Sequence, residues 1–156
     1  MASNGNVNFR DLENFRRKLE EKLSDDQIDL FIQSCAKELA ARLLAKVIKR
    51  TPVGEYPKST GKMGGTLRRG WTGEQRQSAS AYANSLRVNQ FGGNYVIEII
   101  NPVEYASYVE FGHRTRNGEG WVEGKFMLTI SEDEIQRDAP RVLENKLKKK
   151  LGECFR

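Results

Sequence analysis

The single histidine of this chain, His113, lies in a stretch rich in glycine, arginine and aromatic residues, YVEFGHRTRNGEGWVEGKFM, residues 108–127. An imidazole can serve as a general base for a serine or cysteine nucleophile. The sequence contains neither a nucleophile elbow nor a GxxxxGK[ST] phosphate loop. Catalysis would therefore depend on His113 alone, and we expect that the protein is not an enzyme. A small hydrolase that uses His113 is the least favoured alternative.

The two cysteines, Cys35 and Cys154, are far apart in the sequence, and neither has a second thiol or a histidine nearby. A metal site needs clustered ligands, so this pattern predicts neither a bound metal nor a cofactor. Cys35 falls on the apolar side of a helical pattern, which predicts a buried thiol with a packing role. Cys154, two residues from the end, is expected to be a free thiol.

The chain carries a net charge of +5 and a pI near 9.3, which raises the question of nucleic acid. Basic side chains beside a tryptophan can contact phosphates and stack on bases. Acidic residues are interleaved here, however, with Glu119 and Glu123 close to Trp121. Arginine and tryptophan are also enriched where proteins bind each other. The composition therefore favours a protein partner, with DNA contact as the open alternative.

The length of 156 residues is typical of one domain, expected to span 1–156 with flexible ends at 1–8 and 152–156. No apolar run approaches the roughly 20 residues that a membrane span requires. The first residues, MASNGNVNFRDLENF, lack the pattern of a secretory signal. We therefore expect a protein made and kept in the cytoplasm, with no membrane partner.

Two helices are indicated in the first third of the chain. Apolar residues at steps of three and four predict a short amphipathic helix over 9–23. Ser24 then opens SDDQ, a pattern typical of a helix N-cap, with Asp25 and Asp26 complementing the helix dipole. A second apolar stripe continues without a break to Ile48, and Pro52 ends it by forcing Thr51 into an extended conformation.

The middle of the chain predicts a small antiparallel sheet after a long irregular loop. Residues 52–66 combine two prolines with four glycines and show no periodicity. Alternating apolar residues predict strands over 66–73, 85–91 and 95–101, with Gly92–Asn94 as a hairpin turn. The expected fold class is α+β, with long amphipathic helices on one face of this sheet and two long glycine-rich loops.

The remainder predicts a short helix, the second glycine-rich loop and a closing helical region. Residues 103–111 have near-helical spacing, with Gly112 as the C-terminal stop. We expect Tyr105, Tyr108 and Phe111 to anchor this helix to the core. From Phe126 onward apolar residues recur at helical spacing, and Pro140 should kink or split the helix because it lacks an N–H.

Several short motifs occur in an order that resembles a known family, and they cover nearly the whole chain, roughly residues 9–151. They are Thr51-Pro52; Thr60-Gly61 followed by Leu67, Arg68 and Trp71; Glu104, Tyr105, Ala106, Glu110, Gly112 and Arg114; and Gly124, Phe126 and Met127. This order resembles the small neck or tail-completion proteins, also labelled tail components, of long-tailed double-stranded DNA phages and prophages. The stretch between Gly61 and Leu67 is longer here than is usual in the family.

The resemblance implies a structural virion protein at the head–tail junction, assembled in the host cytoplasm, that joins the head connector to the tail tube. It implies a homo-oligomeric ring, expected to be hexameric, with head-completion or connector proteins and tail-terminator or tail-tube proteins as partners. DNA passing through the lumen is a further possible contact. The loops 52–66 and 112–124 would carry the contacts, through Lys58, Lys62, Arg68, His113, Arg114, Thr115, Arg116 and Trp121.

Overall fold

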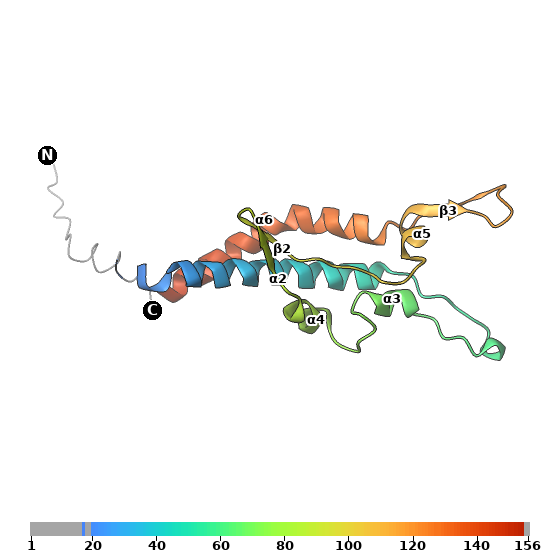
Figure 1. The fold of residues 1–156 in the computed structure, drawn as a ribbon, viewed down its shortest axis with the longest axis horizontal. Helices are drawn as coiled ribbons and strands as arrows, with labels where there is room; N and C mark the ends of the chain where they lie inside the picture. Colours follow the sequence, from blue (N-terminus) through green and yellow to red (C-terminus); the bar gives the residue numbers. More distant parts are fainter. Residues whose placement is uncertain (1–16, 18–19, 155–156) are drawn as a thin grey trace, which may run out of the picture.

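The computed structural model describes Arg17 and residues 20–154, and its fold class is α+β, as expected (Figure 1). The helical elements are α2 (Asp25–Arg50), the 3-10 helix η1 (Lys58–Thr60), α3 (Thr66–Gly70), α4 (Ala79–Ser85), α5 (Ala106–Phe111) and α6 (Met127–Cys154). The strands are β1 (Asn89–Phe91), β2 (Asn94–Val96), β3 (Gly112–Arg114) and β4 (Trp121–Glu123). Most of the helix predicted over 9–23 lies outside the described residues, but residues 20–22 are helical.

The helix α2 begins and ends where the sequence predicts. The Ser24 side chain accepts a hydrogen bond from the Gln27 backbone N–H at 3.4 Å, as an N-cap does, and Asp25 and Asp26 fill the first turn. Thr51, before Pro52, has the extended angles φ −66° and ψ 125° that end the helix. Local signals therefore set both ends of this 26-residue helix.

The long helices α2 and α6 lie alongside each other, and α4 packs against α2 as well (Figure 1). The buried core runs along α2 and continues into α3, α4 and the start of α6: Ala40, Leu44, Val47, Leu67, Trp71, Ala83 and Met127. Pro140 lies within α6 without splitting it, and Figure 1 shows the helix changing direction near its middle. The kink is therefore confirmed and the split is not.

The strand predicted over 66–73 is wrong, because residues 66–70 form the helix α3. Leu67 and Trp71, four residues apart, are buried, whereas Arg69, which would share their face in a strand, is exposed. Gly70 lies against Asn101 and Val103, where an added Cβ would approach Val103 Cγ2 to 2.9 Å. Asn101 Nδ2 also donates to the Leu67 carbonyl oxygen at 2.8 Å. Packing against a distant segment thus prevails over the local alternation.

The predicted hairpin forms, but the predicted three-stranded meander does not. Strands β1 and β2 pair antiparallel with Phe91 opposite Asn94, so Gly92 and Gly93 form the turn with φ of 54° and 83°. The Tyr95 hydroxyl donates to Asp29 Oδ1 at 2.7 Å, and this bond lowers the pKa of Asp29 and fastens the hairpin to α2. Residues 97–101 belong to neither a strand nor a helix.

A second two-stranded sheet follows α5, with β3 and β4 antiparallel. The described residues therefore contain two separate small sheets, and α2 packs on α4 and α6. Gly112 is the C-cap of α5 with φ 86°, a conformation that favours glycine, and this part of the prediction is confirmed. None of the helices in the described part of the chain is long and apolar enough to cross a bilayer.

Candidate functional site

Two segments project from the same end of the α2–α6 pair, opposite the start of α2 and the end of α6 (Figure 1). The first arm, residues 52–65, leaves α2 and returns at α3, with η1 in its outer part. The second arm, residues 112–124, contains the β3–β4 hairpin and leads into α6. The bases of the arms are close, because Arg50 at the end of α2 donates to Ser131 Oγ and pairs with Glu134 of α6, each at 2.7 Å.

Thr51 fixes the start of the first arm. Its side chain is fully buried, and its hydroxyl donates to the Val47 carbonyl oxygen at 2.6 Å. The same hydroxyl accepts the Trp71 Nε1–H at 2.8 Å. A buried indole N–H needs a partner, and Thr51 provides it from twenty residues away. The arm therefore begins at a point tied to both α2 and α3.

Arg68, one of the predicted contact residues, also belongs to this base. Its Nε and Nη2 atoms donate to the Thr51 carbonyl oxygen at 3.2 and 2.7 Å, and the side chain is half-buried. The planar guanidinium suits such a fork of two bonds. The structure thus gives Arg68 a role within the subunit, which the sequence pattern alone did not indicate.

Glu110 fixes the base of the second arm and is buried, with 5% of its surface exposed. Its carboxylate accepts the backbone N–H groups of Leu128 and Thr129 at 2.9 and 2.8 Å, and the Thr129 hydroxyl at 2.7 Å. It therefore caps the N-terminus of α6, where the helix dipole favours a negative charge. Sequence reasoning gave Glu110 no role except as part of the family motif, because its partners lie 18 and 19 residues away.

Two backbone hydrogen bonds and a glycine complete this base. Lys125 N–H donates to the Val109 carbonyl at 2.7 Å, and Phe126 N–H donates to the Glu110 carbonyl at 3.0 Å. Gly124 lies directly on this backbone, so an added Cβ would come within 2.6 Å of the Phe111 carbonyl carbon. Glycine is therefore required where the second arm returns to α6.

Beyond its base the second arm is a hairpin, with His113 opposite Val122 and Arg114 opposite Trp121. Its turn is held by local bonds, in which Thr115 N–H donates to the Gly120 carbonyl at 3.0 Å and Gly120 N–H donates to Thr115 Oγ1 at 2.9 Å. Arg114, Arg116 and Trp121 are exposed, whereas Thr115 is half-buried. The structure thus gathers five predicted contact residues on one hairpin.

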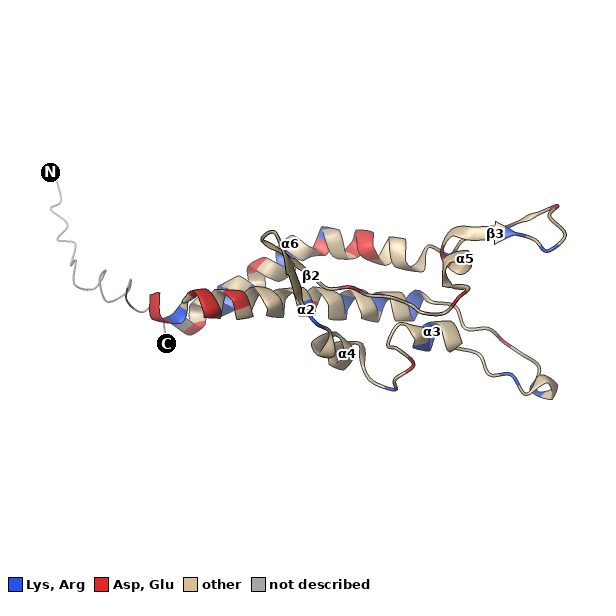
Figure 2. Ribbon diagram, viewed as in Figure 1, with Lys and Arg blue, Asp and Glu red and all other residues tan. Residues whose placement is uncertain are grey.

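The first arm carries the other two predicted residues. Lys58 lies in η1 and is exposed, and Lys62 Nζ lies 5.9 Å from the centre of the Tyr56 ring. Val53, Tyr56 and Met63 are exposed too, with Met63 at 75% of its surface. Figure 2 shows basic residues in both arms, so the two arms present cations and apolar side chains at one end of the subunit.

The expectation that Tyr105, Tyr108 and Phe111 anchor α5 to the core is wrong. Their exposed fractions are 45%, 58% and 62%. Ala106 and Val109 pack against the core instead, because a helix of six residues can bury only one of its faces. The segment that leads into the second arm therefore exposes three aromatic side chains, and sequence periodicity did not reveal which stripe would face inward.

The geometry around His113 does not assemble a catalytic group. Its ring lies 5.8 Å from that of Tyr108, and its buried Nδ1 has no hydrogen-bond partner. Among the described residues, no hydroxyl, thiol or carboxylate is hydrogen-bonded to it, and no cluster of three potential metal ligands occurs. Cys35 is a half-buried free thiol on α2 whose pKa is raised by burial, so it is held in the unreactive protonated form.

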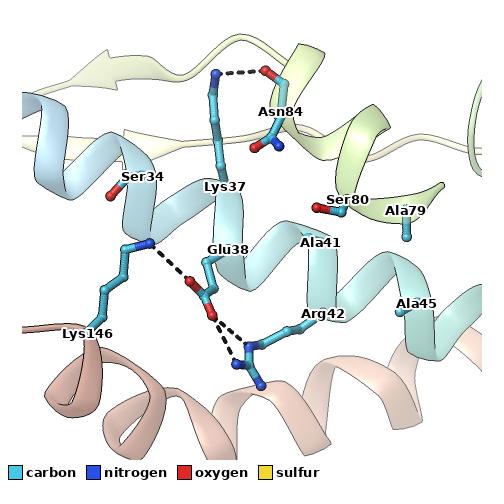
Figure 3. Close-up of a pocket in the computed structure, with 10 residues that line it drawn as sticks. All are labelled: Ser34, Lys37, Glu38, Ala41, Arg42, Ala45, Ala79, Ser80, Asn84 and Lys146. Atoms are coloured by element: carbon cyan, nitrogen blue, oxygen red, sulfur yellow. Dashed lines mark hydrogen bonds and ion pairs between the residues drawn. The ribbon is translucent and has the colours of Figure 1, made fainter. Parts of the chain in front are cut away.

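Outside the arms, a hollow of about 580 Å³ lies between α2, α4 and α6 (Figure 3). Its charged groups are already paired: Glu38 accepts from Lys146 at 3.0 Å and from Arg42 at 2.9 Å, and Lys37 donates to the Asn84 carbonyl at 2.9 Å. The pairing with Lys146 lowers the pKa of Glu38. These bonds join the three helices, and the hollow is part of the scaffold.

Comparison with known proteins identifies one protein family. A family model described as "Bacteriophage HK97-gp10, putative tail-component" matches residues 13–112. Neither the curated proteins nor the solved structures contain a significant match to the chain. The matched range includes α2, the first arm, α3 and α5, up to the first residue of the second arm.

Proposed function

The chain belongs to the HK97-gp10-like family of bacteriophage tail components, and we propose from this premise that it is a subunit of the head–tail junction. In that role it completes the tail or forms a neck ring that joins the head connector to the tail tube. The subunits contact one another head to tail in a closed, hexameric ring, and the ring is part of the virion. Such contacts place two different surfaces of each subunit together.

The observation that carries this proposal is the pair of arms at one end of the α2–α6 pair (Figure 1). They display Tyr56, Met63 and Trp121 to solvent, and exposed apolar side chains that are gathered in one region mark protein interaction sites. The buried bases hold both arms in place before any partner arrives. Less conformational entropy is then lost on binding, which suits arms that contact ring neighbours and the proteins above and below.

The second arm can be tested by shortening it without disturbing its base. Replacing residues 114–121 with Asn-Gly keeps two cross-strand pairs, Gly112 with Glu123 and His113 with Val122. Asn-Gly then closes the shortened hairpin with a favourable two-residue turn. We expect the shortened subunit to fold, as measured by circular dichroism, and to yield few infectious particles. The matched control replaces Gly92-Gly93 with Asn-Gly in the other hairpin. Unchanged particle yield with the shortened arm would refute the proposal for this arm.

A second candidate function is direct contact with DNA. The arms expose Lys58, Lys62, Arg114 and Arg116, and the chain has a net charge of +5. If all four cations neutralise phosphates, the logarithm of the duplex binding constant should fall with the logarithm of salt at a slope of about −4. A subunit that contacts only proteins should bind duplex DNA weakly, with no difference between the native chain and a variant with all four cations replaced by glutamine.

A further inference from the structure

A hollow of about 260 Å³ lies where the first arm leaves α2. Its walls come from both legs of this arm and from α5, and its apolar lining includes Val53, Tyr56, Met63, Leu67, Tyr105 and Val109. The hollow also exposes backbone, because Gly54, Gly64 and Gly65 line it. A flat apolar group with a single donor, such as an indole, fits this lining, since it buries ring surface and can donate to a backbone carbonyl.

Two glutamates are next in the chain to residues that line this hollow. Glu55 precedes Tyr56 and Glu104 precedes Tyr105, and both glutamates are exposed. Neither has an ion pair or a side-chain hydrogen bond to another described residue. The cations at this hollow are Lys62, over the Tyr56 ring, and Arg69, whose Nη1 donates to the Gly64 carbonyl oxygen at 3.1 Å. Because both cations already have a contact within the subunit and neither carboxylate does, the two glutamates can pair with a guest that brings positive charge along with its apolar group.

The second arm carries that combination. Trp121 is 56% exposed, and its cross-strand neighbour is Arg114, with Arg116 following in the turn. Both arginines are exposed and have no carboxylate partner within the described residues. Of the two glutamates on this arm, Glu119 accepts from Asn117 in the turn, and Glu123 lies at the base, where its backbone is opposite Gly112. The tryptophan is thus flanked by arginine on the outer part of the hairpin.

The Trp121 of a given subunit does not face the hollow of that subunit. Its indole lies over its own hairpin, with Cζ2 3.0 Å from the position of a Cβ built on Gly112. The arms are also well separated along their length in Figure 1. The hollow and the tryptophan are consequently two different surfaces of one subunit, as a head-to-tail contact between copies requires.

We propose that the hollow beside the first arm binds the second arm of a neighbouring copy, with Trp121 entering it and Arg114 pairing with Glu55 or Glu104. This inference rests on the ring assembly proposed above and names the contact that would close it. Tryptophan and arginine are, with tyrosine, the residues most enriched among those that dominate such interfaces, and they are usually surrounded by weaker contacts that exclude water.

Photo-crosslinking in assembled particles tests the contact. A benzoylphenylalanine at position 56, in the wall of the hollow, should yield a covalent dimer whose crosslinked peptide lies within residues 114–123 of the second copy. The same group at position 121 should crosslink to residues 52–67 or 105–109. If the chain is present in particles and crosslinks elsewhere or forms no dimer, the inference fails and the ring proposal stands. If the chain is absent from particles, the proposed function fails as well.

Charge reversal provides an independent measurement. Arg114→Glu should weaken self-association by about tenfold or more, measured by sedimentation or by particle yield, and combining it with Glu55→Arg and Glu104→Arg should restore most of the loss. Trp121→Ala should weaken association by at least about tenfold. The matched controls are Arg87→Glu and Phe91→Ala, exposed residues of the other hairpin region, which should change nothing. Failure of the triple variant to recover would overturn the pairing with Glu55 and Glu104.

Discussion

At their bases the two arms are held by buried side chains with several partners each, whereas their outer parts are held by bonds between near neighbours in sequence. Thr51 is bonded to Val47, Arg68 and Trp71, and Glu110 is bonded to two residues of α6. In the turn of the second arm, by contrast, the bonds join residues within 115–120. The outer parts therefore contribute little to the free energy of unfolding.

This difference divides the family motifs into two groups. Leu67, Trp71, Glu110 and Gly124 hold the arms in place, while Arg114 is exposed on the second arm. Substitutions at the bases should lower the stability of the subunit. Substitutions in the outer parts should leave folding intact and affect assembly alone. Four experiments can break or sharpen this distinction.

The largest effect is expected from Trp71→Ala. The indole is 3% exposed, packs in the core and donates to Thr51. Its removal should lower the free energy of unfolding by about 3–5 kcal/mol, because a large cavity remains and the Thr51 hydroxyl loses a partner. Urea unfolding measures this, and Trp121→Ala is the matched control, expected to stay within about 0.5 kcal/mol. Equal losses for both tryptophans would contradict the distinction between base and outer part.

A smaller effect is expected from Glu110→Gln. The amide retains one acceptor oxygen, while its NH₂ group faces the N–H groups of Leu128 and Thr129. A buried donor left without an acceptor costs about 1–3 kcal/mol, so α6 should fray at its start and the melting temperature should fall. Glu123→Gln, an exposed glutamate on β4, serves as the control. No change at position 110 would show that the cap is dispensable.

The ion pairs at the junction of α2 and α6 predict a modest dependence of stability on pH. The hydrogen bond from Lys46 and then that from Arg50 lower the pKa of Glu134 below its ordinary value of 4.5. Folding therefore favours the ionised form, and its contribution is complete above about pH 5 and is lost as the pH falls through the lowered pKa. Glu134→Gln should flatten the fall in melting temperature between neutral and acidic pH. If the melting temperatures of the variant and of the native chain fell in parallel with pH, Glu134 would be excluded as a source of the pH dependence.

The smallest effect on stability is expected in the outer part of the first arm. Lys62→Gln removes a cation that lies 5.9 Å from the Tyr56 ring at an exposed site. Contacts of this kind contribute about 0.5–1 kcal/mol at most, so the melting temperature should hardly change. The duplex-binding assay provides the second measurement for this variant. A clear loss of stability would show that the first arm is held along its length as firmly as at its base.

The two ends of α2 and the β1–β2 turn could be predicted because their causes are local. The Ser24 side chain accepts a hydrogen bond from the N–H three residues later, and Pro52 forces the residue before it out of the helical conformation. Gly92 and Gly93 form the turn through their own positive φ angles. The strand predicted over 66–73 failed for the opposite reason. Leu67, Arg69 and Trp71 would share one face of a strand, but Leu67 and Trp71 are buried and Arg69 is exposed, and the Arg69 N–H donates to the Gly65 carbonyl as in a helix.

The predicted contact residues show the same limit. The sequence indicated that residues 112–124 form a segment distinct from the core, and the structure gathers His113, Arg114, Thr115, Arg116 and Trp121 on one hairpin. It could not separate Arg68 from that group, because the partner of Arg68 is the carbonyl oxygen of Thr51, 17 residues earlier. Nor could it show that Tyr105, Tyr108 and Phe111 face outward, since either stripe of α5 is apolar enough to be buried.

The sequence by itself therefore determined the long helix α2, the α+β class, the glycine turns and the order of motifs that identifies the family. These depend on contacts between residues a few positions apart, whose free energies are fixed by local geometry. The tertiary structure alone decided the roles of Thr51, Arg68, Trp71 and Glu110, because their partners lie up to 20 residues away. The tertiary structure also decided that both arms point in one direction. Arg50 joins the end of α2, where the first arm begins, to Ser131 and Glu134 near the start of α6, where the second arm ends.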